Sequence, residues 1–505
     1  MKKIFAMIMT ICLMASALCV TTLAAEATDG LVLRVSALKD DGSLEVIEEY
    51  DSFETGWNFA MEKAKDNNYL DNNDYVRIVV DLLTDWKANA KGEFGDSDGV
   101  GFRQSTIYVP DSARVMLNMN GHTIDRGLGD NNELDGEVIC IEEDSDVIIN
   151  GGKNGDEIAR ADDTDATVQF GTITGGNSDN GAGGIHIQDD AKVTLNNVKI
   201  VGNVADGDDG GGIAMYDQAS LIMNGGGFLD NKNDSFEGCY GAAIYIYNCT
   251  AKFNKVLFSN NQFTYKSGEG AAISSRSDSV IEVSECKFIN NGNWNEKAGA
   301  KGAVSVIYMS DSDSQIDLKN TVFEGNGSSE ENLFASKTLC VLVLYGADLT
   351  MDNCTFTKNH ARDYVINTHT GYPNEVFAYN STFTNNDGGV FQGDEAEFTN
   401  CTFDKNGGSY TFCVGMFVSK RVILRDCNLG NSTFENAKKV VIVDTDAENG
   451  AASIFGGGSL AMIVSFVALI VSVAAIVVNV SSKKKVAYAA ANNAAANNAA
   501  ETDEE

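Results

Sequence analysis

The strongest constraint on the fold of this chain is a repeat that runs through most of it. The segments DNCTFTKN (residues 352–359) and TNCTFDKN (residues 399–406) place a cysteine, a phenylalanine and an asparagine at the same offsets. If Phe356 is taken as the reference position, apolar equivalents recur every 20 to 35 residues, at Ile200, Phe228, Phe258, Phe288, Phe323, Phe383, Phe403 and Leu429. An asparagine stands three residues after each of them except Leu429. A period of this length is typical of solenoids.

Each repeat predicts three short strands. The residues seven and five positions before the reference are apolar in every repeat and alternate with mostly polar neighbours, which is the period of a strand. Pairs such as Asn196-Asn197 and Asp352-Asn353 follow, and they suit a tight bend because asparagine tolerates left-handed backbone. The reference residue itself lies in the third strand of each repeat. The first strand is expected at a small-apolar ladder, namely Gly184-Ile185, Gly212-Ile213, Ala243-Ile244, Ala272-Ile273, Ala303-Val304, Cys340-Val341, Gly389-Val390 and Cys413-Val414.

Three short strands per period bury their apolar faces only when successive coils stack on one another. The sequence therefore predicts an all-β fold, a right-handed parallel β-helix, the hand following from the general preference of parallel crossovers. The expected β-helix spans residues 105–446 and follows an N-terminal α/β cap over residues 28–104. In that cap, residues 52–66 place Trp57, Ala60, Met61 and Ala64 on one helical face, and residues 75–83 form a buried strand. Residues 438–444 are expected to be the last strand.

The cysteines of the repeat receive an architectural interpretation. Two residues before the reference, Cys286, Cys354, Cys401 and Cys427 alternate with Val, Thr, Ser and Gly, and Cys340 and Cys413 fall in the small-apolar ladder, so we expect all six to point inward. There is no C-x₂-C or paired-histidine signature, so no metal site and no cofactor are expected. We expect buried free thiols rather than disulfides, with Cys239 and Cys249 as the pair to test for a bond. The repeated asparagine is expected to form a stacked amide ladder; a binding role is the alternative.

The two ends of the chain indicate export and membrane attachment. Residues 1–27 combine two lysines, an apolar run and a small-residue cleavage pattern, as in a secretory signal peptide. Residues 460–480 carry no charge and as a helix would span roughly 31 Å, enough to cross a bilayer. Lys483, Lys484 and Lys485 follow, which predicts a cytoplasmic C-terminus and a single-pass protein of the cell membrane with a large extracellular domain. Residues 447–459 are expected to be a linker, and residues 481–505 a low-complexity tail.

The repeats resemble a known group of proteins. The glycine-rich motifs (GGIHI, GGIAM, GAAIYI, GAAIS) followed by F-x-x-N motifs (FLDN, FSNN, FINN, FEGN) are similar to the repeats of chlamydial polymorphic outer membrane proteins. The segment LNMNGHTIDRG (residues 117–127) resembles the N-terminal coil of pectin-lyase-like β-helix surface proteins of gut bacteria. The resemblance covers about 320 residues and implies a β-helix fold. It implies an adhesive role only as an expectation, because one fold carries many activities.

The outer face beside the small-apolar ladder is the expected place for a ligand. The candidate ligand-binding residues there are His186, Gln188, Tyr216, Tyr245, Tyr247 and Arg276, an aromatic and hydrogen-bonding stripe suited to glycan; the alternative is ordinary solvent-facing β-formers. No carboxylate occupies the outward positions of these strands, whereas glycoside hydrolysis normally needs two. No catalytic residue is therefore assigned.

The net charge of the chain limits the classes of partner that it can bind. With 72 acidic and 37 basic residues the net charge is −35, which excludes nucleic acid as a natural partner. The acidic groups around Asp162 and Asp206 lie in loops and do not match a calcium-loop spacing, so solvated loop charge is expected, with weak calcium binding as the alternative. The resulting hypothesis is an adhesive or structural surface protein that binds glycan or a host surface. The alternative is a polysaccharide lyase or glycoside hydrolase that uses loop carboxylates such as Asp208 and Asp209 and acts on acidic, plant or mucin glycans.

Overall fold

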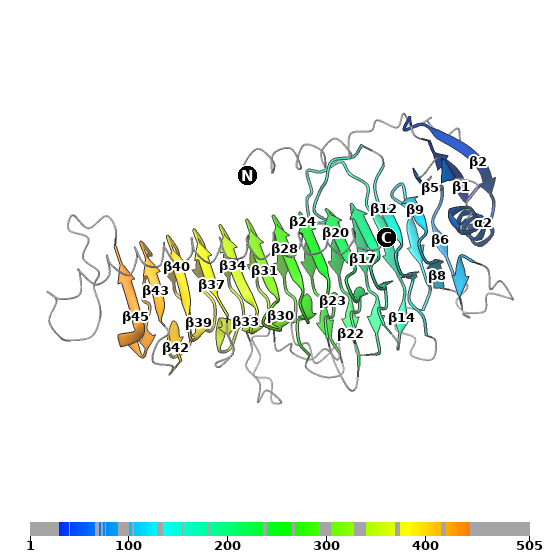
Figure 1. Ribbon diagram of the computed structural model, residues 1–505. Helices are drawn as coiled ribbons and strands as arrows, with labels where there is room; N and C mark the ends of the chain where they lie inside the picture. Colours follow the sequence, from blue (N-terminus) through cyan, green and yellow to red (C-terminus); the bar gives the residue numbers. More distant parts are fainter. Residues whose placement is uncertain are drawn as a thin grey trace, which may run out of the picture.

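The computed structural model of the chain is an elongated stack of β-coils (Figure 1). It describes residues 30–444, except residues 40, 66–69, 72–73, 76, 89–99, 104–105, 129–134, 154, 180, 208, 236–239, 265–267, 293–304, 328–339, 369–373 and 416–420. The predicted signal peptide, linker, membrane span and C-terminal tail lie outside these residues. Within the described part of the chain, no helix is long and apolar enough to cross a membrane.

Three long sheets run side by side along the stack. The first, called sheet I, has 15 strands in the order β2 (Leu44–Tyr50), β1 (Leu33–Leu38), β5 (Ile78–Leu82), β9 (Arg114–Asn118), β12 (Asp146–Asn150), β16 (Lys192–Asn196), β20 (Ser220–Asn224), β24 (Thr250–Asn254), β28 (Val280–Ser284), β31 (Gln315–Lys319), β34 (Asp348–Asp352), β37 (Val376–Tyr379), β40 (Ala396–Thr399), β43 (Val422–Arg425) and β45 (Val440–Val443).

Sheet II follows sheet I in each coil and contains the reference residues of the repeat. Its 11 strands are β6 (Trp86–Lys87), β10 (Thr123–Asp125), β13 (Gly171–Thr174), β17 (Val198–Val201), β21 (Gly227–Leu229), β25 (Leu257–Ser259), β29 (Lys287–Ile289), β32 (Val322–Glu324), β35 (Thr355–Thr357), β38 (Thr382–Thr384) and β41 (Thr402–Asp404).

Sheet III precedes sheet I in each coil. Its 13 strands are β7 (Phe102–Arg103), β8 (Thr106–Val109), β11 (Ile139–Ile141), β15 (Ile185–Ile187), β19 (Ile213–Met215), β23 (Ile244–Tyr247), β27 (Ile273–Arg276), β30 (Ser305–Ser310), β33 (Cys340–Tyr345), β36 (Tyr364–Thr368), β39 (Gly389–Gly393), β42 (Phe412–Val414) and β44 (Phe434–Glu435).

Two smaller sheets complete the strand inventory of the described residues. Sheet IV lies between sheets II and III in four consecutive coils and comprises β14 (Asn177–Ser178), β18 (Val204–Ala205), β22 (Lys232–Asn233) and β26 (Gln262–Phe263). The repeat predicted a loop there. The strands β3 (Leu70–Asp71) and β4 (Asp74–Tyr75) form an antiparallel pair. A short 3-10 helix, η3 (Ala437–Lys439), precedes the last strand.

The strand pairing confirms that the coils stack in register. Ile200 pairs with Phe228, and the same column continues without a slip through Phe258, Phe288, Phe323, Phe356 and Phe383 to Phe403. From Phe258 to Phe356 the rings stack face to face with centroids 4.5 Å apart. Like residues therefore lie above one another in a continuous apolar core, the arrangement of a parallel β-helix.

The predicted asparagine features are also present. Asn291 is fully buried, its Oδ1 accepts hydrogen bonds from the backbone N–H (3.2 Å) and the Nδ2 (2.8 Å) of Asn261, and its own Nδ2 donates to the carbonyl of Phe258 (2.9 Å). The same pattern repeats along the stack, which makes the column an amide ladder. Several bends between sheets I and II use left-handed asparagine, with φ of 52° at Asn197 and 53° at Asn353, whereas Lys255 and Glu285 take this conformation in two other coils.

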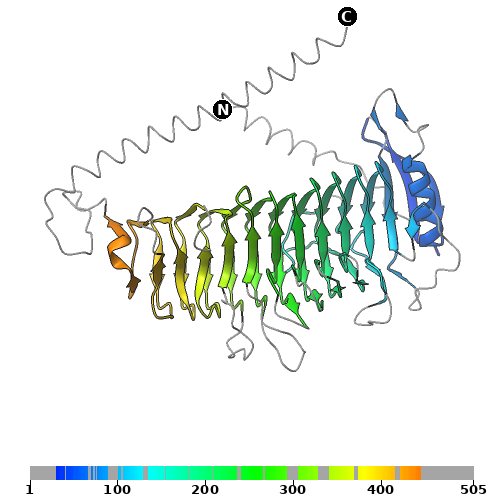
Figure 2. The same ribbon diagram turned by 60° about the horizontal axis from the view of Figure 1, so that its bottom comes forward.

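An N-terminal segment covers one end of the stack (Figure 2). Helix α2 (Phe53–Lys65) buries Phe53, Trp57, Ala60 and Met61, and β1 pairs antiparallel with both β2 and β5. The indole Nε1 of Trp57 donates to the carbonyl oxygen of Tyr108 in sheet III (3.2 Å). The predicted helical face is confirmed, with Ala64 only partly buried. β5 pairs in parallel with β9, so the covering segment belongs to sheet I together with the coils.

The predicted small-apolar ladder is correct in the early coils and wrong in the later ones. Ile273 pairs with Ile307, and Ile307 pairs with Leu342. The ladder therefore does not pass through Val341, nor through Val304, which lies outside the described residues. In β30 both Val306 and Ile307 belong to the core, a local irregularity that shifts the alternation. A ladder through Val304 would have placed Ile307, three residues later, on the outer face. Ile307 is instead fully buried, and Tyr308 takes the outward position.

The six cysteines that were expected to point inward fall into two groups. Cys286, Cys354 and Cys401 are each 1% exposed at the inward position, as predicted, and Cys427 there is partly buried. Cys340 and Cys413 were expected to point inward, and this is wrong. Cys340 packs with Tyr308 and Val343 in a cluster separate from the main core, and Cys413 donates a hydrogen bond to Oε2 of Glu435 (2.7 Å). All eight described cysteines are free thiols; Cys239 is outside the described residues.

Candidate functional site

The predicted ligand-binding residues lie together on the outer face of sheet III. His186 in β15 is in register with Ala214 in β19 and Tyr245 in β23. Tyr247 at the end of β23 is in register with Arg276 at the end of β27. Gln188 and Tyr216 follow directly after β15 and β19, so continuing the register places them in the column of Tyr247. Two neighbouring columns on four consecutive coils thus contain all six residues.

Aromatic rings in these columns form a continuous row of contacts, which we call the aromatic row. It begins at His186, whose ring centroid is 5.3 Å from that of Tyr216, and continues to Tyr245 at 5.9 Å. Tyr245 lies 5.8 Å from Tyr240, which reaches the face from the loop before β23. Edge-to-face and stacked pairs at these separations are stabilising. The row is therefore a built surface rather than a scatter of tyrosines.

Arg276 of β27 extends the aromatic row to the coils of β30 and β33. Its guanidinium carbon lies 4.2 Å from the ring centroid of Tyr240 and 5.6 Å from that of Tyr308, and the ring of Tyr308 contacts that of Tyr345 at 5.6 Å. Nη2 of Arg276 also forms an ion pair with Glu269 (2.8 Å). The cation is thus held between rings and a carboxylate, which fixes the orientation of its side chain.

Exposure separates the residues that present this surface from those that support it. Tyr247 is 38% exposed, whereas Tyr245 is 6% and Tyr308 7% exposed. The ring of Tyr245, one of the candidate ligand-binding residues, packs against Ala182 and Ala214. Burial raises the pKa of both Tyr245 and Tyr308, so neither phenol ionises in the neutral range. These two rings support the face, and Tyr247 presents it.

Carboxylates reach this face from loops, although no carboxylate occupies the outward positions of the strands. Asp209 accepts a hydrogen bond from the hydroxyl of Tyr216, and Glu269 pairs with Arg276. In both cases the acid lies seven residues before its partner, in the loop that leads into the strand. The strand alternation did not reveal them because they lie outside the strands. Each of these carboxylates is engaged by a side chain of the row.

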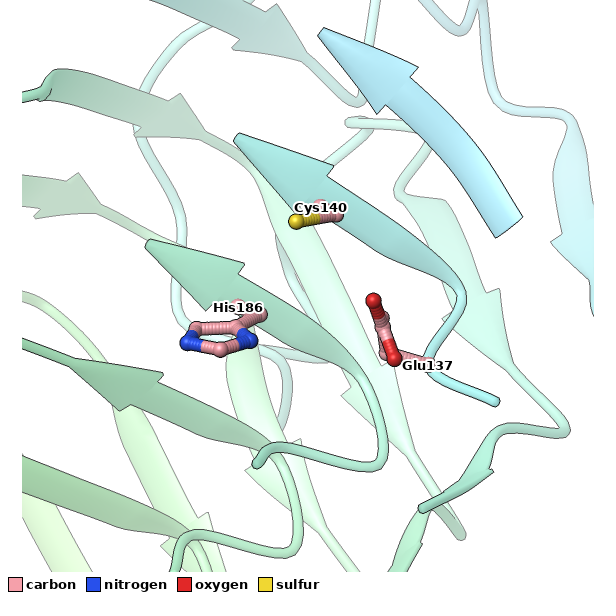
Figure 3. A group of neighbouring side chains, drawn as sticks. All are labelled: Glu137, Cys140 and His186. Carbon is pink, nitrogen blue, oxygen red and sulfur yellow. The ribbon is translucent and has the colours of Figure 1, made fainter. Parts of the chain in front are cut away.

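A second group of side chains lies at the N-terminal end of the same face. Cys140 in β11 is in register with His186 in β15, and Glu137 lies two residues before β11. One ligand atom from each of the three residues lies within 4.8 Å of the others. Figure 3 shows the three side chains on the same side of β11 and β15, with the Glu137 carboxyl beside both. Thiolate, imidazole and carboxylate are the three side-chain ligands that proteins use for zinc.

The surroundings of this group determine its ionisation. Burial lowers the pKa of His186 to about 4, so its imidazole is neutral in the physiological range. Burial also raises the pKa of Glu137. Nε2 of Gln188 donates to Sγ of Cys140 (3.7 Å) and to Oε1 of Glu142 (3.5 Å). Gln188, predicted as a glycan ligand, therefore contacts the thiol of this group.

Sequence reasoning identified His186 but missed its neighbours. Cys140 and His186 are 46 positions apart, and the small-apolar ladder was traced back only to Gly184. Extending it one coil to Val138 and Ile139 would have aligned Cys140 with His186, because both follow an inward isoleucine. No local motif contains the three residues, so only the coil register brings them together.

Comparison with known proteins identified no relative of this chain. No protein-family model matches the chain, and searches of curated proteins and of solved structures found no match to it. The function must therefore be argued from the fold and from the two groups of residues on sheet III.

Proposed function

We propose that this chain is a bacterial cell-surface protein whose β-helix binds an extended glycan along the outer face of sheet III. The single observation that carries the proposal is the aromatic row, which runs across successive coils from His186 to Tyr345. Aromatic faces are suited to the apolar faces of sugar rings, and the amide and hydroxyl groups beside them to sugar hydroxyls. Coils repeat at about 4.8 Å, close to the repeat of an extended sugar chain, so a polysaccharide aligned with the row meets similar groups at each step.

The finer features of the proposal come from the sequence. They are a right-handed β-helix of the pectin-lyase-like type, a cleaved signal at residues 1–27, and a membrane-spanning helix at residues 460–480 with the C-terminus in the cytoplasm. In this arrangement the rod stands outside the cell and acts as an adhesive or structural element. The net charge of −35 favours neutral glycans, or host proteins with basic surfaces, over anionic polymers.

The test is binding of the full-length protein to a panel of polysaccharides and host glycans. Tyr247→Ala removes the exposed ring of the face, and we expect affinity to fall roughly tenfold, about 1.4 kcal/mol. Tyr379→Ala is the matched control, because Tyr379 is 36% exposed but lies in sheet I, away from the row. Equal affinity of both variants and the wild type for every bound glycan would contradict the assignment of this face. No binding to any glycan would leave a plain structural rod.

The alternative function, a polysaccharide lyase or hydrolase, is favoured by one observation. Asp209 and Glu269 lie on this face, and acid catalysis of glycosidic cleavage uses pairs of carboxyl groups. Release of oligosaccharides from the bound polymer would establish it, provided that Asp209→Asn and Glu269→Gln each abolish release. Binding without product release would favour the adhesive role.

A further inference from the structure

We propose that Glu137, Cys140 and His186 form a binding site for a divalent transition-metal ion of the zinc class. The proposal rests on the geometry of the described residues and is independent of glycan binding. Nothing in the spacing of these residues along the chain suggests it, because the three side chains come from two coils.

The first argument is convergence on rigid elements. Cys140 and His186 occupy equivalent positions of paired parallel strands, so the backbone fixes the separation of their side chains. Glu137 lies just before the same strand as Cys140, and one ligand atom from each of the three residues falls within a 4.8 Å group. Tetrahedral zinc at about 2.0 to 2.3 Å from each ligand requires ligand atoms that are closer to one another than about 4 Å, so small side-chain rotations complete the site.

The second argument is the state of the imidazole. The ring of His186 is partly buried, lies 5.3 Å from the ring of Tyr216, and forms no hydrogen bond with any residue that the structure describes. A neutral imidazole nitrogen without a protein partner can bind a metal ion.

The third argument is the space beside the ring. An ideal Cβ built on Gly181 would lie 2.9 Å from Nδ1 of His186, and Gly181 has a φ of +122°, a conformation that favours glycine. Any side chain there would press on the imidazole. Gly181 therefore keeps the space beside Nδ1 of His186 free of a side chain.

The charges around the group are compatible with a cation. Glu137 and Cys140 would bind as carboxylate and thiolate, and their two negative charges balance a divalent ion. Cys140 gives up its thiol proton to solvent on binding, as does Glu137 when it is protonated. Nearby charged groups are Arg126, whose side chain is buried, and Asp135, both of which act electrostatically on Glu137. Gln188 and Glu142 lie beside the thiol and would orient it.

Three protein ligands leave the fourth zinc position for water or a ligand from solution. This pattern is typical of sites that act on a ligand rather than of closed structural sites. Because His186 is also the first ring of the aromatic row, the open position would lie at the end of that face.

The test uses the full-length protein, freed of metal with a chelator under reducing conditions and titrated with Co²⁺ and then Zn²⁺. We expect one Co²⁺ per chain, with a near-ultraviolet thiolate-to-cobalt charge-transfer band that Zn²⁺ displaces. Cys140→Ser should abolish the band. His186→Gln and Glu137→Gln should each weaken Co²⁺ binding at least roughly tenfold.

The matched control is Cys413→Ser. Cys413 is a partly exposed thiol beside a carboxylate on the outer face of sheet III, and among the described residues it belongs to no such group with a histidine. This variant should keep the band and the stoichiometry of the wild type. Thermal unfolding of every metal-free variant shows whether it has folded, and only folded variants are compared. Absence of stoichiometric Co²⁺ binding by the wild type would overturn the proposal, as would a band that survives in folded Cys140→Ser.

Discussion

At the scale of single residues, the buried asparagines are the most consequential side chains. Asn291, inside the ladder, joins three coils. Its Oδ1 accepts from Asn261 and its Nδ2 donates to the carbonyl of Phe258, both in the preceding coil, and its backbone N–H and Nδ2 donate to Oδ1 of Asn326 in the next coil. The repeat predicted this ladder, because an invariant spacing of asparagine at a turn has few other physical explanations. A second amide ladder, from Asn118 through Asn150 and Asn196 to Asn224 at the outer edge of sheet I, was not predicted. Its members belong to the bend pairs, and their mutual contacts depend on strand register.

Asn291→Ala tests the buried ladder. The substitution leaves the backbone N–H and Nδ2 of Asn261 and the carbonyl of Phe258 without these partners in a fully buried position. We expect a loss of about 2 to 4 kcal/mol in the free energy of unfolding, measured by chemical denaturation. Gln315→Ala, at an exposed position of β31, should change it by less than about 0.5 kcal/mol. A cost for Asn291→Ala as small as that of the control would show that the amides are not structural.

At the scale of elements, the loop of residues 152–170, which we call the strap loop, connects coils that are distant in sequence. Its backbone N–H at Ala161 donates to Gly226 O (3.0 Å), and Asp162 forms an ion pair with Lys287 of β29 (2.7 Å) as well as with Arg160. Figure 1 shows the loop leaving β12 and running above the neighbouring strands. Asp162 was predicted to be a solvated loop charge, and this is wrong. Nothing in the sequence distinguishes Asp162 from Asp163 beside it.

Asp162→Asn tests the strap loop and has a defined pH dependence. Burial raises the pKa of Asp162, but hydrogen bonds from Lys287 and Arg160 outweigh it and the net pKa is lowered. A lowered folded-state pKa gives stability that is present above the unfolded-state pKa, near 4, and lost as the pH falls through the folded-state value. We therefore expect the variant to be less stable than the wild type by about 1 kcal/mol at pH 7, with the difference disappearing in acid.

The neighbouring residue provides the control for this prediction. Asp163 is exposed, and the one described partner of its carboxylate is the backbone N–H of Asp165 (3.2 Å). Asp163→Asn should leave the thermal unfolding profile unchanged at both pH values. If the two variants behaved alike, the strap contact would have no energetic role.

Sheet III shows where prediction from the sequence ends. The alternation of β15 to β27 follows the small-apolar ladder, and the candidate residues on these strands lie on one face. From β30 onward, adjacent inward residues such as Val306 and Ile307 break the alternation, and insertions in the preceding loops remove the spacing that would have fixed the register. For the same reason Cys340 and Cys413 were assigned to the wrong side. The carboxylates Asp209 and Glu269 could not be assigned, because a loop's path over a sheet is decided by tertiary contacts.

At the scale of the whole molecule, the stack makes distance along the rod proportional to the number of coils rather than to the number of residues. Phenylalanine and asparagine columns fix the register in sheet II, and the paired strands of sheet I transmit it along the molecule. The same register creates both proposed sites, because the aromatic row and the Glu137, Cys140 and His186 group are each assembled from neighbouring coils. If the stacking were different, neither site would exist.

The central claim is tested most directly by distances between spin labels on the outer edge of sheet I. Lys192, Gln315 and Arg421 lie on one column there, in coils joined by successive parallel pairings. With labels attached through unnatural amino acids, pulsed electron paramagnetic resonance should give a distance of about 19 Å between positions 192 and 315, which are four coils apart. It should give about 38 Å between positions 192 and 421, eight coils apart, from a spacing of about 4.8 Å per coil. A second distance that is not close to twice the first would contradict the stacked-coil architecture.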